Sequence, residues 1–138
     1  MWRRIFGFGS VVMFLSLPFI VHAADNDHLK FEVYADKEHE YRWRLKQGDE
    51  TLATAGQAYT EKASCKKSIE GVMKGVETDK DKFEVYEDRA MGYRWRLRAS
   101  NGQLVAASSK GYKDKSACQK AVDMIKKEVP KAQVVEPK

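Results

Sequence analysis

Phe83-Glu84-Val85-Tyr86 and Tyr93-Arg94-Trp95-Arg96-Leu97 determine the architecture, because both stretches are second copies of earlier residues. The first repeats residues 31–34 and the second repeats residues 41–45, each time 52 positions later. The correspondence continues to the pair Cys65 and Cys118 after one residue is gained in the second copy. A duplicated unit must fold the same way twice, so every prediction of structure is tested against two sequences.

Period-two alternation predicts three strands in each copy. Phe83 and Val85 alternate with polar residues, and Trp95 and Leu97 alternate with arginines, which is typical of strands with one buried face. Asn101-Gly102 is a strong hairpin signal, and residues 104–108 then form a third strand. The first copy has Asp49-Glu50 at that turn, which predicts a looser loop.

A helical stripe follows the strands in both copies. The apolar positions recur at spacings of 4, 3 and 4, and they are Cys65, Ile69, Val72 and Val76, then Cys118, Val122, Ile125 and Val129. Thr60 and Asp114 are the predicted N-caps. Each repeat is therefore β-β-β-α.

The strand register follows from the residue types. Pairing Glu84 with Arg96 places Val85 opposite Trp95, which gives one apolar and one polar face. The turn at 101–102 places Leu97 opposite Ala106 on the same apolar face. The predicted fold is α+β: two tandem β-β-β-α(-β) repeats, related by a pseudo-twofold axis, form a single mainly antiparallel sheet with two helices on one face.

The N-terminus predicts export. Arg3 and Arg4 precede an apolar run at 5–21, and small residues end at Ala23, which is typical of a signal peptide cut after Ala23. An uncleaved anchor is the alternative. The expected organisation is a signal peptide at 1–23 and one domain at 24–138, with repeat one at 30–77, repeat two at 82–130 and a C-terminal strand or tail at 131–138. Cleavage lowers the net charge from +5 to +3, so we expect a periplasmic or secreted protein that is not integral to a membrane.

Two interpretations of the cysteines remain open. Export permits a disulfide between Cys65 and Cys118, which would join the repeats. Alternatively, both are small buried apolar residues at the start of their helical stripes.

The polar strand face is the candidate binding site. Arginines beside aromatic rings can bind anionic ligands, and these residues are Arg42, Arg44, Arg94, Arg96, Tyr34 and Tyr86. The competing interpretation is cross-strand pairing of Arg44 with Glu32 and of Arg96 with Glu84. His28 and His39 lie among carboxylates but are expected in solvated loops. The pattern predicts no catalytic group, metal or cofactor, and no nucleic-acid partner.

The chain resembles the YegP-like family, a family of unknown function. The matching residues are Phe83-Glu84-Val85-Tyr86-Glu87-Asp88, Tyr93-Arg94-Trp95-Arg96-Leu97, Asn101-Gly102 and Gly111-Tyr112-Lys113-Asp114-Lys115. The resemblance implies that the stretch after each helix is a fourth strand, which can be swapped between units.

We expect a small, exported, non-enzymatic binding or envelope-associated protein, as a monomer or homodimer. Its ligand would contact the uncovered sheet face or the loops at 36–40 and 47–50, where the copies differ. The alternative is a structural or oligomerising domain that pairs through its sheet edges. A dedicated polyanion-binding protein and an enzyme rank lower.

Overall fold

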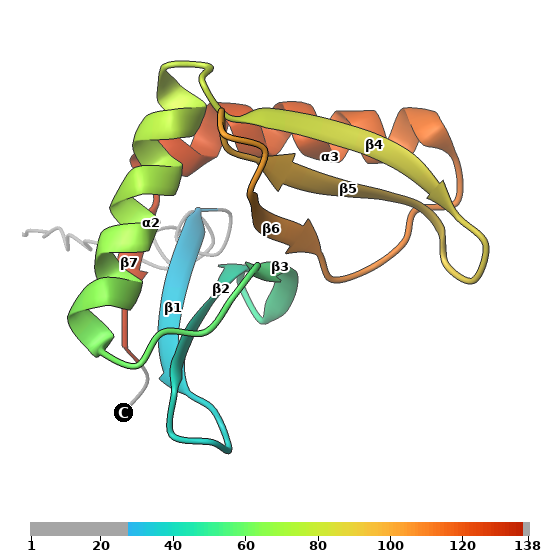
Figure 1. Cartoon of the computed structure of the whole chain (residues 1–138). Coiled ribbons are helices and arrows are strands. Elements are labelled where there is room, and N and C mark those ends of the chain that lie inside the picture. Colours follow the sequence, from blue (N-terminus) through green and yellow to red (C-terminus); the bar gives the residue numbers. More distant parts are fainter. Residues whose placement is uncertain (1–27, 137–138) are drawn as a thin grey trace, which may run out of the picture.

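One seven-stranded sheet runs through both repeats, with strand order β4-β5-β6-β3-β2-β1-β7 (Figure 1). The computed structural model describes residues 28–136, so the predicted signal peptide at 1–23 lies outside the described residues. The elements are β1 (Leu29–Ala35), β2 (Tyr41–Gln47), β3 (Glu50–Ala55), α2 (Lys62–Glu77), β4 (Lys82–Asp88), β5 (Gly92–Arg98), β6 (Leu104–Ser108), α3 (Lys115–Glu128), the 3-10 helix η1 (Val129–Lys131) and β7 (Gln133–Val135). The predicted fold class is confirmed.

The predicted register is also confirmed. Glu84 lies opposite Arg96 and Val85 opposite Trp95, and β1 and β2 pair in the same way in the first repeat. Leu97 lies opposite Ala106, as expected. Alternation of apolar and polar residues fixes this register, because a slip of one residue would turn every core side chain towards solvent.

The two repeats meet at the antiparallel pair β3–β6. Thr54 lies opposite Ala107 there, and these two residues occupy equivalent positions in the two copies. A pseudo-twofold axis therefore passes between β3 and β6, and the sheet is continuous across it.

Both helices cover the same face of the sheet. α2 packs on β1 and β2, and α3 packs on β4 and β5 (Figure 1). Both predicted helical stripes are buried in one core. Trp43 and Trp95 are the largest buried side chains. They contact Phe31 and Phe83 edge to face, with ring centroids 5.1 and 5.4 Å apart.

Of the two interpretations of the cysteines, the structure does not show the disulfide. Cys65 and Cys118 are buried free thiols. The physical reason is their placement, because Cys65 lies on α2, which packs on β1 and β2, whereas Cys118 lies on α3, which packs on β4 and β5. Burial raises the pKa of both thiols, which favours the protonated form. The interpretation as small apolar residues therefore holds.

The two hairpin turns are the reverse of what we predicted. In the first repeat Gln47 pairs with Glu50 across the tight turn Gly48-Asp49, where Gly48 adopts φ 61°. In the second repeat the longer loop 99–103 contains Asn101-Gly102. A register irregularity after Leu45 and another after Leu97 separate these turns from the regular ladders.

Helix capping differs between the repeats. The Asp114 side chain accepts a hydrogen bond from the Ala117 amide at 2.8 Å, as an N-cap should. Thr60 does not cap α2, because the N-cap position is Glu61, which makes no side-chain capping bond.

A fourth strand follows only one helix. β7 comes after α3 in repeat two and pairs in parallel with β1 of repeat one, as the swapped arrangement requires. Within residues 28–136, the chain after α2 leads directly into β4 and forms no such strand. The expectation of a fourth strand in both units is therefore wrong for repeat one.

The two buried tryptophans differ in hydrogen bonding. The Trp43 indole N–H donates to Ser68 Oγ at 3.1 Å, whereas Trp95 Nε1 is buried without a partner among the described residues. Ala121 occupies the position equivalent to Ser68, three residues after the helix cysteine. The second repeat therefore lacks the serine hydroxyl that accepts from this donor in the first, and the Tyr112 hydroxyl is the polar group near Trp95 there.

We expect Ala121→Ser to raise the free energy of unfolding by about 1 kcal/mol, because it supplies the missing acceptor. Urea denaturation measures the effect, and indole N–H exchange of Trp95 should slow. The reverse change, Ser68→Ala, should cost a similar amount by orphaning the Trp43 indole. Destabilisation by both changes would contradict the assigned equivalence.

Candidate binding face

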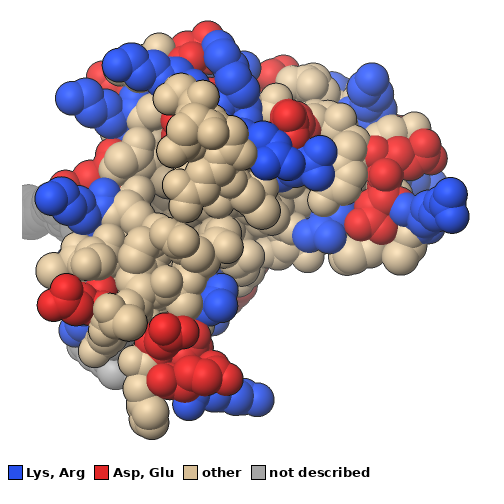
Figure 2. All heavy atoms as spheres, in the orientation of Figure 1, with Lys and Arg blue, Asp and Glu red and all other residues tan. Residues whose placement is uncertain are grey.

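The open face is the side of the sheet opposite the helices. Its basic side chains outnumber its carboxylates: Lys30, Arg42, Arg44, Lys46, Lys82, Arg94, Arg96 and Arg98 against Glu32, Asp36, Glu84 and Asp88. The two hairpins project as separate arms with a hollow between them, and carboxylates gather near both tips (Figure 2).

A symmetrical row of side chains crosses the middle of this face. Small side chains lie at its centre and ion pairs at its ends, in the order Glu32, Arg44, Thr54, Ala107, Arg96 and Glu84. Both copies of the Tyr-Arg-Trp-Arg-Leu motif therefore place one arginine beside the pseudo-twofold axis.

The inner arginines are paired and stacked, as the cross-strand interpretation predicted. Arg44 Nη2 lies 2.5 Å from Glu32 Oε1, and its guanidinium stacks over Tyr34 at 4.4 Å. Arg96 Nε lies 2.6 Å from Glu84 Oε1, and its guanidinium stacks over Tyr86 at 4.6 Å. Each guanidinium is thus held flat and in a defined orientation.

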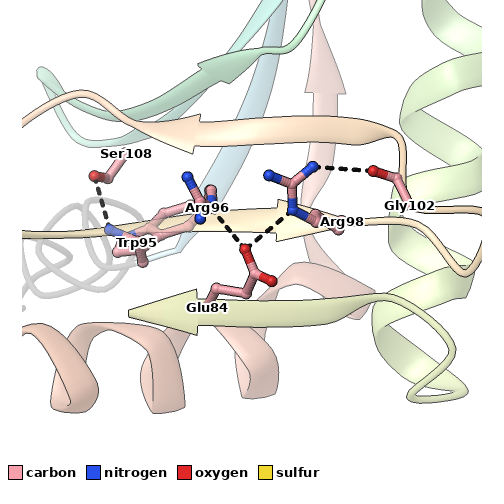
Figure 3. A network of polar contacts seen from close by, with 6 residues as sticks. All are labelled: Glu84, Trp95, Arg96, Arg98, Gly102 and Ser108. Carbon is pink, nitrogen blue, oxygen red and sulfur yellow. Dashed lines mark hydrogen bonds and ion pairs between the residues drawn. The ribbon is translucent and has the colours of Figure 1, made fainter. Parts of the chain in front are cut away.

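The second repeat extends this contact into a network (Figure 3). Arg98 Nε also donates to Glu84 Oε1 at 3.0 Å, and Arg98 Nη1 donates to the Gly102 carbonyl at 3.0 Å. Hydrogen bonds from Arg96 and then Arg98 lower the pKa of Glu84. One carboxylate therefore serves two guanidinium groups.

The outer arginines are tied to the hairpin loops. Arg42 Nε donates to Asp36 Oδ2 at 3.1 Å, and Arg94 Nη1 lies 3.5 Å from Asp88 Oδ2. Arg94 also donates to the Ser108 carbonyl, while its Nε is buried without a partner in the described part of the chain. All four predicted arginines therefore have ion-pair partners.

The loop at 36–40 borders a hollow on this face. Asp36 accepts amide hydrogen bonds from Glu38 at 3.0 Å and Glu40 at 2.9 Å, and the Glu40 bond is the main cause of its lowered pKa. The hollow measures about 660 Å³ and is lined by Tyr34, Ala35, Asp36, Lys37, Glu38, Arg42 and Thr54. The loop at 47–50 lies at the other end of β2, so the structure separates the two loops.

Two like-charged pairs were missed by the sequence analysis. Lys30 lies directly opposite Lys46, and Lys82 lies opposite Arg98. Lys82 bonds Asp79 and Arg98 bonds Glu84, but neither Lys30 nor Lys46 has an ion-pair partner within residues 28–136. Opposed like charges are unfavourable across strands. Both pairs could have been predicted by continuing the register from the Glu32–Arg44 and Glu84–Arg96 pairs to the next residues on the same face.

The histidines lie outside this arrangement. His39 occupies the 36–40 turn with φ 64°, and His28 is exposed before β1. Within the described residues, no group of three or more His, Cys, Asp and Glu side chains could hold a metal ion.

Among residues 28–136 no helix is long and apolar enough to cross a membrane.

Acid should weaken the fold through the carboxylates of this face. The pKa of Glu84 is lowered from its usual 4.5, so the stabilisation is complete above pH 4.5 and is lost as pH falls through the lower folded value. We expect the urea concentration at the unfolding midpoint to decrease once the pH drops below 4.5. This decrease should be less steep in Glu84→Gln. Glu70→Gln, which removes an exposed carboxylate of α2, should follow the wild type. An identical acid response in Glu84→Gln would contradict the assignment.

Comparison with known proteins places both repeats in one family. The family model described as "Domain of unknown function (DUF1508)" matches residues 36–81 and 88–136. A UPF0339 protein in the ptx operon 5' region of Stutzerimonas stutzeri is 33% identical over 109 residues, covering 77% of this chain and 94% of the relative. A UPF0339 protein of Methanosarcina acetivorans is 46% identical over 54 residues, 39% of this chain and 91% of the relative, so that protein is about one repeat long.

Two solution NMR structures show the same fold. The protein of unknown function yegP from E. coli superposes with a TM-score of 0.66 at 23% identity, covering 79% of this chain and 92% of that one. A UPF0339 protein from Shewanella oneidensis gives a TM-score of 0.63 at 19% identity, covering 78% and 90%.

Proposed function

The chain belongs to the DUF1508 family of unknown function, and we propose that it is an exported, non-enzymatic protein that binds an anionic partner through the open face of its sheet. The observation that supports this most directly is the opposed pair Lys30 and Lys46. A face that served only to stabilise the fold would gain from a carboxylate at one of these positions.

The paired arginines support the same proposal in a different way. Each inner guanidinium keeps N–H groups free to donate, because Arg44 uses Nε and Nη2 on Glu32 Oε1 and Arg96 uses Nε on Glu84 Oε1. The guanidinium groups are already oriented by their tyrosines, so less side-chain entropy is lost on binding. An anion lying along the row would contact Arg44 and Arg96 on both sides of the small residues Thr54 and Ala107.

Heparin affinity chromatography tests this proposal with the mature chain 24–138. We expect retention at low salt and earlier elution of the double variant Lys30→Gln/Lys46→Gln. The matched control is Lys67→Gln/Lys120→Gln, which removes the same charge from equivalent exposed positions on α2 and α3. Equal shifts for both double variants, or no retention of the wild type at low salt, would refute a specific anionic face.

Export is supported by the basic N-terminus, the apolar run at 5–21 and the small residue Ala23. Expression of the full chain in a bacterium followed by mass spectrometry should yield a protein that begins at Ala24 in the periplasm or medium. A full-length protein retained in the cytoplasm would refute export, and a full-length protein in the membrane fraction would favour the anchor.

A structural or oligomerising role is the second candidate, and one observation favours it: within the described residues, β4 is the last strand on its side of the sheet. Light scattering distinguishes the two functions. A stable dimer would favour the structural role, and a monomer at high concentration would favour the binding role.

A further inference from the structure

The two edges of the sheet are finished differently. β7 covers the outer edge of β1, whereas β4 has no neighbour on its outer side among residues 28–136 (Figure 1). Connectivity explains the difference. Residues after α3 are free to form η1 and β7, but residues 78–81 must connect α2 to β4 and cannot also lie beside it. Tandem fusion therefore leaves one strand position unfilled.

The unfilled position has the same acceptor sequence as the filled one. On β1, Lys30, Phe31 and Glu32 pair with Gln133, Val134 and Val135. On β4, Lys82, Phe83 and Glu84 repeat these three residues 52 positions later. The edge that would receive a strand therefore presents the side chains that already receive β7.

The helix beside each edge continues this correspondence. Glu136, directly after β7, binds Lys62 at 2.8 Å and Lys66 at 3.3 Å on α2. Lys115 of α3 is the equivalent of Lys62, and it is exposed with no ion-pair partner in the described part of the chain. A carboxylate following a strand on β4 would meet this lysine.

Burial shows what the missing strand would cover. Phe31 and Val33 on β1 are 1% and 2% exposed. Their equivalents on β4, Phe83 and Val85, are only partly buried although they face the same core. A strand added along Lys82, Phe83 and Glu84 would lie beside Phe83 as β7 lies beside Phe31, and it would pair the free backbone groups of the edge.

We infer that the outer edge of β4 is a strand-accepting site for an extended peptide segment of a partner protein, which adds in parallel as β7 adds to β1. The segment has an apolar residue opposite Phe83 and a carboxylate two residues later that reaches Lys115. Backbone hydrogen bonds supply affinity, and these two side-chain contacts supply selectivity.

A second copy of this chain fits the edge less well. Antiparallel self-pairing centred on Glu84 sets that carboxylate against itself, and pairing centred on Tyr86 sets Glu84 against Asp88. Pairing centred on Val85 sets Phe83 opposite Glu87. Pairing centred on Phe83 sets Lys82 against Glu84 without repulsion over these three residues, so a peptide-independent dimer is the competing outcome in the test below. Donation of β7 by a second copy would leave its own β1 uncovered, so the exchange gains no strand pair.

The test uses the mature chain 24–138, labelled with ¹⁵N, and a capped synthetic peptide with the sequence Lys131-Ala132-Gln133-Val134-Val135-Glu136. We expect amide shifts that saturate with peptide at residues 82–85 and at Lys115, while the protein remains monomeric. A peptide with proline in place of both valines should not bind, because it cannot donate to the edge.

Lys115→Glu should weaken binding of this peptide at least about fivefold, the equivalent of 1 kcal/mol for an exposed ion pair. The matched control is Lys120→Glu, which makes the same charge change at an exposed position of α3, and it should bind like the wild type. Shifts confined to the β1 edge, equal loss in both variants, or a peptide-independent dimer with shifts at residues 82–85 would overturn the inference.

Discussion

Trp43→Ala is expected to lower the free energy of unfolding by about 3–5 kcal/mol, the range for truncating a large buried aromatic residue. The Trp43 side chain is 2% exposed, packs edge to face on Phe31 and donates its indole N–H to Ser68. Alanine leaves a cavity beneath α2 and removes the donor that bonds Ser68 Oγ. Urea denaturation followed by circular dichroism measures the loss.

The same variant tests whether the repeats unfold together. In a chain of residues 24–138, Trp95 is then the remaining tryptophan and reports on repeat two. Because one core spans the β3–β6 junction, we expect Trp95 fluorescence and circular dichroism to change at the same, lower urea concentration. Tyr34→Ala on the open face is the control and should cost about 1 kcal/mol or less. A Trp95 transition that stays at its wild-type position would show that the repeats unfold independently.

Local pattern and duplication predicted the parts of the fold that depend on nearest neighbours in sequence. Alternation at Phe83 and Val85 sets one core face, and the same alternation at Phe31 and Val33 tests it. A register error would have had to place apolar residues in solvent in both copies. The ion pair between Glu84 and Arg96 was predicted for the same reason, because it depends only on that register.

Two features that depend on the placement of distant elements were not predicted. The equivalence of Cys65 and Cys118 suggested a bond, but equivalence under a twofold axis does not bring two residues together unless both lie at the axis. Thr54 and Ala107 lie there, and the cysteines do not. The bare edge of β4 was missed because it follows from connectivity, which the resemblance of the two repeats conceals.

On the candidate binding face, the sequence predicted residue types better than their surroundings. The arginines and tyrosines share one face as expected, but each predicted arginine has an ion-pair partner. Within residues 28–136, Lys30 and Lys46 are the opposed cations that lack one, at the far ends of their strands. The repeated motifs span residues 31–34 and 41–45, whereas the uncompensated charges lie directly outside them, at Lys30 and Lys46.

Gly56→Ala is expected to lower the free energy of unfolding by about 1–3 kcal/mol, as overpacking at a closed interface does. Gly56 follows β3 at the junction of the repeats, and its amide donates to the Val105 carbonyl at 3.1 Å. A methyl group there would collide with the carbonyl oxygen of Leu104. That oxygen belongs to the backbone of β6, so relief of the clash requires β3 and β6 to separate.

The sign of this change is diagnostic, because Gly→Ala stabilises by about 0.4–1 kcal/mol through the unfolded chain wherever the folded site accepts the methyl group. Gly71→Ala is the matched control. Gly71 is exposed in the middle of α2 with no heavy atom within 4 Å of the added methyl group, and this variant should be more stable by about 0.5–1 kcal/mol. Urea midpoints that move in opposite directions for the two variants would locate the constraint at the β3–β6 junction. If both variants were stabilised, the junction would have to be more open than the close approach of Gly56 and Leu104 indicates.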